Sequence, residues 1–348
     1  MNMRVAVIPE RLGGGLSPCG SIRLAAFFDF MRGMPDLKWD IRYLILEELE
    51  QFCPDVIVWQ RVSLPKLAQV ELVASYAKRT GALMVYELDD NLLELEDPGE
   101  RKAYADKLKA VERSLAAADL VWCSTSNLQE RVSGLTRNPP QHLPNALDPV
   151  LWCNPQAQVA GGGAFRILYM GTRTHAADLQ LLLGAMDILQ RKFPDRFRLS
   201  IIGVADHYPQ QSWLEVIEPP AYIGSSYGAF VYWLQQQSGF HLGVAPLLNS
   251  RFNECKSGIK VLDYAALGLP SLVSDVAAYA DFVADVDCFK VENRAESWAE
   301  SIAEVLFDGS RTRRVSSRAK SLVCERVFSA AALSRVESIG SGLKKICS

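Results

Sequence analysis

The chain has 348 residues, 49% of them hydrophobic, which is enough to build two hydrophobic cores of ordinary domain size. Its formal net charge is −3, whereas general nucleic-acid-binding proteins are usually basic. We therefore expect a two-domain protein with no nucleic-acid partner.

The residue types that bind metals show no metal-site pattern. The eight cysteines are scattered without a C-x-x-C pair or zinc-ligand spacing, and the four histidines form no H-E-x-x-H pattern. The sequence thus predicts reduced cysteines and no metal. The first residues, MNMRVAVIPE, lack the apolar core of a signal peptide, and no run approaches the roughly 18 apolar residues that span a bilayer. These features predict a cytoplasmic protein.

The first half of the chain alternates helical stretches with strand-like runs, at residues 4–9, 55–60, 82–89 and 119–125. Such alternation predicts an α/β domain with a parallel, doubly wound sheet. Residues 101–113 form a cationic helical stretch within it. Peripheral contact of this stretch with the inner membrane surface stays open, although a solvated helix face is the favoured interpretation.

A glycine-rich segment, residues 11–23, follows the first strand-like run. Glycines let backbone N–H groups approach a phosphate or a sugar closely, so Gly14, Gly15 and Arg23 are candidates for an acceptor or phosphate loop. The segment does not fit G-x-G-x-x-G, and a flexible turn is the alternative interpretation.

Three acids, Glu87, Asp89 and Asp90, come at the end of the third strand-like run. Clustered carboxylates can bind hydroxyl groups of an acceptor or serve as a base, and they can also cap the next helix. We take Asp89 as the candidate catalytic residue among them.

A proline-containing linker, HLPNALDP at residues 142–149, follows the first strand series. Strand-like runs then resume at residues 166–172, 198–204, 240–247 and 270–275, and the chain ends in a helical stretch. We therefore predict a first domain at residues 1–147, a second Rossmann-like domain at 148–326 and a C-terminal helix at 327–348.

The most informative segment of the second domain is FNECKSGIKVLDYAALGLPSLVSD, residues 252–275, which reads as loop, helix and strand after a buried strand. Ser257, Gly258 and Ile259 would lie at the helix N-terminus, where free N–H groups and the helix dipole favour an anion. Lys256 adds a full positive charge, and the Asp263 carboxylate can accept hydrogen bonds from sugar hydroxyls.

A second loop should reach the same place. It follows the strand-like run at residues 166–172, and Gly171, Thr172 and Arg173 would line the edge where ligands bind to open parallel sheets. The alternative interpretation is that Arg173 is a solvated loop residue and His175 a helix cap.

The segment at residues 252–275 resembles the C-terminal donor-site motif of the retaining glycosyltransferases of family 4, which have the GT-B fold. Gly258 matches the motif glycine, Asp263 its second acid and YAALGLP its tail, while the first acid falls on Cys255, with Glu254 before it. The KSGIK and DYAALG forms are closer to a branch associated with O-antigen and other surface polysaccharides. The linker is similar to the Pro-Asn-x-x-Asp linker of the family.

The resemblance implies a GT-B fold, in which two Rossmann-like domains face each other across a cleft and the C-terminal helix crosses back to the first domain. It implies retaining transfer of a sugar from a nucleoside-diphosphate sugar to a hydroxyl of a glycan or a lipid-linked acceptor, without a cofactor or a metal. The candidate catalytic residues are Lys256, Arg173, Glu254 and Asp89. The candidate donor-binding residues are Gly171, Thr172, Ser257, Gly258, Ile259 and Asp263, and the family gives Asp263 the ribose.

Two alternatives remain at this stage. A sugar-nucleotide epimerase of the same fold would bind a similar donor but would require acids and histidines in the cleft to move a proton. A non-catalytic protein that binds a sugar nucleotide or a glycan fits the cysteine at position 255 and the absence of a family lysine near Ala177. A Rossmann dehydrogenase is disfavoured because the glycine-rich segment does not fit the dinucleotide motif.

Overall fold

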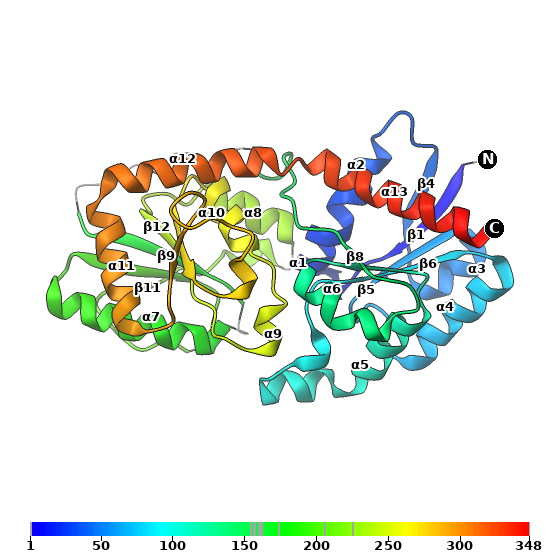
Figure 1. Cartoon of the computed structure of the whole chain (residues 1–348), viewed down its shortest axis with the longest axis horizontal. Coiled ribbons are helices and arrows are strands. Elements are labelled where there is room, and N and C mark those ends of the chain that lie inside the picture. Colours follow the sequence, from blue (N-terminus) through cyan, green and yellow to red (C-terminus); the bar gives the residue numbers. More distant parts are fainter. Residues whose placement is uncertain are drawn as a thin grey trace.

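The computed structural model describes residues 2–153, 155, 158, 163–172, 175–204, 207–224 and 226–347. These residues form two α/β domains that lie side by side (Figure 1). Each domain is built on a six-stranded sheet in which every pairing is parallel. The structure thus shows two doubly wound domains.

The first sheet has the strand order β4-β1-β5-β6-β7-β8. Its strands are β1 (Met3–Ile8), β4 (Trp39–Tyr43), β5 (Val56–Gln60), β6 (Leu83–Leu88), β7 (Leu120–Cys123) and β8 (Gln141–His142), and a small hairpin pairs β2 (Arg11–Leu12) with β3 (Gly15–Leu16). The helical segments of this domain are α1 (Pro18–Gly20), the π-helical turn η1 (Ser21–Ala25), α2 (Ala26–Arg32), η2 (Leu46–Glu48), α3 (Leu49–Phe52), α4 (Leu67–Thr80), η3 (Leu92–Glu94), α5 (Pro98–Ala117), α6 (Ser126–Val132) and η4 (Ser133–Leu135).

Side-chain alternation along the strands explains why this sheet is covered on both faces. In β1, Val5 and Val7 pack into one buried cluster, while Ala6 and Ile8 pack into another. Successive side chains of a strand point to opposite faces, so an unbroken apolar run indicates a strand buried between two helix layers. The helix boundaries follow local chemistry: Asp97 caps α5 by accepting from the Glu100 N–H at 2.8 Å, and α4 ends at Gly81, whose φ is 78°.

The second sheet has the strand order β11-β10-β9-β12-β13-β14. Its strands are β9 (Phe165–Met170), β10 (Phe197–Ile202), β11 (Leu214–Val216), β12 (Leu242–Ala245), β13 (Ser271–Ser274) and β14 (Phe289–Val291). The helical segments are α7 (Ala176–Lys192), η6 (Ala221–Ile223), α8 (Tyr227–Gln235), α9 (Arg251–Glu254), α10 (Ile259–Ala266), η7 (Ala277–Tyr279), α11 (Ala295–Phe307) and α12 (Gly309–Glu325).

Each sheet has a point where the strand order reverses. In the first sheet β1 lies between β4 and β5, and in the second β9 lies between β10 and β12. Connections run to opposite sides from such a strand, so a crevice opens beyond its carboxyl end, and this is where open α/β sheets bind ligands. The segments that follow β1, β5, β9 and β12 are therefore the places to look for a site.

The last helix, α13 (Phe328–Cys347), packs on the first domain after α12 has covered the second (Figure 1). The Phe328 ring stacks on the Phe27 ring with centroids 4.5 Å apart, and Ser338 Oγ accepts from Trp122 Nε1 at 2.8 Å. The domain limits expected at residues 147 and 326 stay predictions. The chain as folded contributes both its first strand and its last helix to one domain.

Candidate functional site

The loop after β9 forms one wall of the crevice in the second domain. A side chain at Gly171 would lie 3.1 Å from His175 Cδ2, and a side chain at Gly203 would overlap the Gly171 carbonyl oxygen. Gly203 therefore needs glycine, whereas a side chain at Gly171 would require the His175 ring to shift by a few tenths of an ångström. Thr172 is exposed at the end of this strand. Arg173, which was predicted to stand beside it, lies outside the described residues.

His175 and Asp178 connect this loop to the loop after β12. The Asp178 carboxylate lies 2.8 Å from His175 Nδ1 through one oxygen, and accepts from the Leu248 N–H at 2.8 Å through the other. Burial lowers the pKa of His175, and the charges of Lys256 and Lys260 lower it further, while Asp178 acts in the opposite direction. The two lysines therefore place positive potential at the crevice.

The N-terminus of α10 forms the opposite wall. Gly258 precedes the helix, and no side chain caps the helix there. A Cβ atom at Gly258 would overlap Phe282 Cε2 and would lie 3.1 Å from the Ala278 carbonyl oxygen, so this position also needs glycine. The first turn of a helix leaves N–H groups without helical partners, which makes an uncapped N-terminus suited to an anion. Lys256, Ser257 and Ile259 flank this N-terminus as the sequence predicts.

Asp263 lies one turn further along α10 and is 6% exposed. One oxygen accepts from Lys260 Nζ at 3.3 Å, and the other has no hydrogen-bond partner among the described residues. Burial raises the pKa of Asp263, while Lys260 lowers it. A buried carboxylate oxygen without a partner is costly, so this oxygen is suited to receive a hydroxyl.

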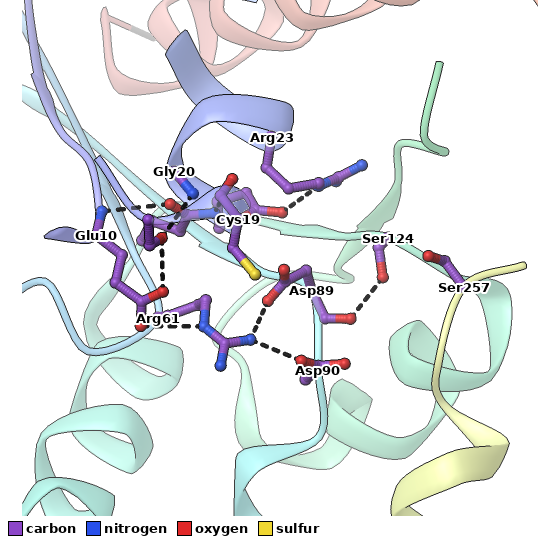
Figure 2. Close-up of polar contacts among 12 residues, drawn as sticks. Glu10, Cys19, Gly20, Arg23, Arg61, Asp89, Asp90, Ser124 and Ser257 are labelled. Carbon is purple, nitrogen blue, oxygen red and sulfur yellow. Dashed lines mark hydrogen bonds and ion pairs between the residues drawn. The ribbon is translucent and has the colours of Figure 1, made fainter. Parts of the chain in front are cut away.

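The first domain faces the cleft with a charged cluster that is centred on Arg61, directly after β5. The Arg61 guanidinium pairs with Glu10 at 3.2 Å, with Asp90 at 2.9 Å and with Asp89 (Figure 2). Burial acts to raise the pKa of Asp89, but Arg61 and the Cys19 thiol hold it below its ordinary value. Asp89 is therefore an ionised acceptor of hydrogen bonds. The Arg61 backbone has a φ of 45°, which is uncommon for a residue other than glycine.

A second buried network in the first domain occupies Arg23. Its Nε donates to Glu87 Oε1 at 2.6 Å, and its Nη1 donates to Asn145 Oδ1 at 2.9 Å. Arg23 is only 1% exposed, so it faces the interior and not the open face of the glycine-rich segment. Asn145 Nδ2 in turn donates to Ser257 Oγ at 2.8 Å, which links the first domain to the donor loop.

The glycine-rich segment forms the β2–β3 hairpin. Gly14 lies at its tip with a φ of 84°, and Gly15 lines an interdomain cavity of about 560 Å³. The other side of this cavity includes Trp152 and Tyr227 of the second domain. Burial raises the pKa of Tyr227, and Asp263 is near enough to raise it further, so the cavity adjoins the crevice.

Helix α9 docks the donor loop on the first domain. Cys255 is 1% exposed and packs into a first-domain cluster, and its carbonyl oxygen accepts from Thr125 Oγ1 at 2.9 Å. The Glu254 carboxylate pairs with Arg131 Nη2 at 3.1 Å and is half-exposed. Asn127 Nδ2 donates to the Glu254 carbonyl at 2.8 Å. Cys255, at the position of the first motif acid, is thus an interdomain contact, and the Glu254 side chain points to Arg131.

Sequence reasoning missed several residues of this cleft. Lys260 could have been found, because it lies one helical turn from Asp263 in the motif. Arg61 and Asn145 carried weaker signals: Arg61 directly follows a strand-like run, and Asn145 belongs to the linker motif. Among the described residues, no group of three or more acids, cysteines and histidines could hold a metal ion. In the same part of the chain, no helix has the length and apolarity to span a membrane.

Solved structures share the fold of this chain. HepE from Anabaena, in complex with UDP-glucose, is 12% identical, with a TM-score of 0.65 over 98% of this chain and 100% of that one. Sucrose-phosphate synthase from Thermosynechococcus elongatus is 12% identical, with a TM-score of 0.65 over 98% and 99%. UDP-GlcNAc 2-epimerase from Neisseria meningitidis, bound to UDP-GlcNAc, is 12% identical, with a TM-score of 0.56 over 97% and 100%. The fold is that of the GT-B class.

The amino-acid sequence also resembles a known protein family. Residues 164–308, which make up most of the second domain, match the family described as glycosyl transferases group 1. No curated protein matches the chain significantly. The GT-B fold and the relationship to this glycosyltransferase family, which the donor-site motif predicted, are therefore confirmed.

Proposed function

We propose that the chain is a retaining, metal-independent glycosyltransferase. It moves a sugar, such as a hexose, from a nucleoside-diphosphate sugar to a hydroxyl of a glycan or a lipid-linked acceptor, as in polysaccharide biosynthesis. The observation that carries the proposal is the crevice of the second domain. There the uncapped N-terminus of α10, two lysines and the free oxygen of Asp263 converge beyond β9 and β12. The solved complexes of HepE with UDP-glucose support a sugar nucleotide as donor.

Departure of the nucleoside diphosphate develops negative charge on phosphate oxygens. In this proposal the uncapped α10 N-terminus and the nearby Lys256 stabilise this charge, and Arg173 stays a prediction for the same role. The Asp263 carboxylate would accept hydrogen bonds from the ribose. The leaving phosphate can take the proton of the attacking hydroxyl, so the reaction needs neither a dedicated protein base nor a cofactor.

We propose that Asp89 is the first-domain group that binds the acceptor. It is ionised and held by Arg61 at the carboxyl edge of the first sheet, so it can accept a hydrogen bond from an incoming hydroxyl. Glu254 stays a prediction for the reaction, and its half-exposed carboxylate is paired with Arg131.

We further propose that the protein works in the cytoplasm and meets lipid-linked acceptors at the inner membrane surface. Some cations of α5 are already engaged, because Arg113 pairs with Glu71 at 2.6 Å and Arg101 donates to the Leu95 carbonyl. Lys102 and Lys109 are exposed and could meet anionic lipid headgroups.

The test is calorimetric binding of UDP, GDP, dTDP and their sugar conjugates. We expect one nucleotide to bind, with the affinity reduced about tenfold in Lys256→Ala and in Asp263→Ala, since each variant loses a hydrogen bond to a charged group. Lys320→Ala is the matched control, because Lys320 is exposed on α12, away from the crevice. A well-folded protein that binds none of these nucleotides would contradict the proposal and favour a glycan-binding role.

The product separates transfer from the main alternative. UDP-GlcNAc 2-epimerase shares the fold, and an epimerase would convert a sugar nucleotide without any acceptor. We expect the sugar nucleotide to stay unconverted until an acceptor is added, and the product to retain the anomeric configuration by nuclear magnetic resonance. Conversion of the donor alone would identify an epimerase.

A further inference from the structure

A continuous path of hydrogen bonds runs from the interior of the first domain to the donor loop. It starts at Glu87 on β6, passes through Arg23 on η1 and Asn145 in the linker, and ends at Ser257 before α10. The three bonds measure 2.6, 2.9 and 2.8 Å. Glu87, Arg23 and Asn145 are 0%, 1% and 7% exposed, so water hardly competes with this path.

The chemistry of the path fixes the direction of every bond. An arginine side chain can only donate, so Asn145 must turn its Oδ1 toward Arg23 and its Nδ2 toward Ser257. Ser257 Oγ is thereby an acceptor from Asn145. The hydroxyl proton of Ser257 is then left for a further acceptor, beside an uncapped helix N-terminus that is suited to an anion.

Two arginines, Arg23 and Arg335, lie near Glu87 at the buried end of the path. Arg335 lies in the same region, with its guanidinium 3.5 Å from the centre of the Phe27 ring. Burial and the charge of Arg23 lower the pKa of Arg335, while the Glu87 carboxylate acts in the opposite direction. Removal of Glu87 would leave the buried Arg23 guanidinium without its ion-pair partner, so the Glu87 carboxylate anchors the path.

We propose that Glu87, Arg23 and Asn145 form a positioning relay that fixes the Ser257 hydroxyl as a hydrogen-bond donor to the diphosphate of the bound nucleotide. The relay rests on the proposed function, because it assigns a role at the same donor site. Glu87 and Arg23 belong to the first domain, whereas Ser257 belongs to the second. The relay is therefore complete only when the domains are apposed as they are here.

The experiment is a double-mutant cycle between Asn145 and Ser257, read by calorimetry with the preferred nucleoside diphosphate and with inorganic pyrophosphate. We expect Ser257→Ala and Asn145→Leu each to weaken binding about tenfold, which corresponds to one hydrogen bond to a charged group. The double variant should bind no more weakly than either single variant, because both changes remove the same interaction.

Asn145→Asp separates positioning from a structural role. An aspartate keeps the bond from Arg23 but also accepts from Ser257, which turns the hydroxyl proton away from the phosphate. We expect the thermal unfolding midpoint to be at least that of the unchanged protein, with binding about tenfold weaker. In the Ser257→Ala background the same substitution should have little effect. An equal effect in both backgrounds would mean that the added charge alone acts, and would overturn the relay.

Asn127→Asp is the matched control. Asn127 also donates across the domain boundary, to the Glu254 carbonyl, but has no bond to Ser257, so we expect pyrophosphate binding within about twofold of the unchanged protein. Absence of binding of both probes to the unchanged protein would overturn the donor site and the relay together. Normal binding of both probes by Asn145→Leu would overturn the relay alone.

Discussion

The His175 ring lies where the loop after β9 enters α7, and its protonation depends on the charge of the surrounding crevice. Asp178 holds one ring nitrogen at 2.8 Å, while the ring is largely buried and feels the charges of Lys256 and Lys260. Burial and the two lysines both disfavour the imidazolium, so the pKa of His175 is lowered. The folded state therefore favours the neutral form of the His175 ring.

This lowered pKa gives the stability a pH dependence. In the unfolded chain His175 regains an ordinary pKa of about 6.5, so below that pH the unfolded state binds a proton that the folded state does not. The free energy of unfolding should therefore fall as the pH drops below about 6.5, and His175→Gln should reduce this loss. Urea denaturation at about pH 5.5 and about pH 7.5 measures this change in the free energy of unfolding. His207→Gln is the control, because His207 is exposed. An unchanged pH dependence in His175→Gln would contradict the assignment.

At the residue scale, sequence reasoning succeeded where one segment carries the chemistry. Lys256, Ser257 and Gly258 could be placed at a helix N-terminus because a strand, a connecting segment and a helix follow one another in the chain, although the short helix α9 in that segment was not predicted. Arg61 and Asn145 could not be placed in this way. Their roles depend on partners 28 to 122 residues away, and only the packed strands bring those partners together.

Helix α10 is the element on which the donor site depends. Its position relative to the sheet is set by two close approaches that exclude a side chain, Gly258 against Phe282 and Gly243 against the Tyr264 ring. The Tyr264 hydroxyl donates to the Val244 carbonyl at 2.8 Å, which ties the helix to β12. The helix N-terminus is therefore held where β12 ends.

A methyl group at Gly258 should disturb this packing. Gly258→Ala places a Cβ atom on Phe282 Cε2, and we expect an overpacking cost of about 1–3 kcal/mol in the free energy of unfolding, together with weaker nucleotide binding. Urea denaturation and calorimetry measure the two effects. Phe282→Leu in the same chain should recover part of both, because it removes the overlapping ring edge. A Gly258→Ala protein of unchanged stability would mean that Phe282 moves freely.

At the element scale, the long apolar runs were identified from sequence and the sheet edges were not. β4, β8, β11 and β14 were not predicted. Three of them, β8, β11 and β14, have only two or three residues, and β4 and β11 are partly exposed. A short or half-exposed edge strand lacks the continuous apolar pattern that marks a central strand.

The whole molecule is held in its apposed arrangement by the α9 region. Cys255 fills a place in the first-domain core, and Arg131 pairs with Glu254 across the boundary. In the family motif this position is occupied by an acid that contacts the transferred sugar. The departure at Cys255 was visible in the sequence, but its partner surface was not, because that surface is built from the segments around Asn91 and Thr125.

Overfilling this position should separate the domains. Cys255→Arg puts a long cationic side chain into an apolar site next to Arg131, and we expect the domains to move apart so that the charge reaches water. Small-angle X-ray scattering should then show a larger radius of gyration, and nucleotide binding should weaken because Ser257 loses Asn145. Cys255→Ala should keep the compact scattering profile. A compact Cys255→Arg protein would show that other contacts hold the domains.

Because α13 returns to the first domain, the first domain can be completed only after the second domain has been synthesised. The ribosome makes the sequence of the entire second domain before it makes Phe328 and Ser338, which complete the first-domain core against Phe27 and Trp122. Domains generally fold as units while the chain emerges, so the second domain can finish first. The first domain, although started earlier, keeps an apolar face uncovered until the last helix leaves the ribosome, and this nascent chain is the stage at which a chaperone would find the most to bind.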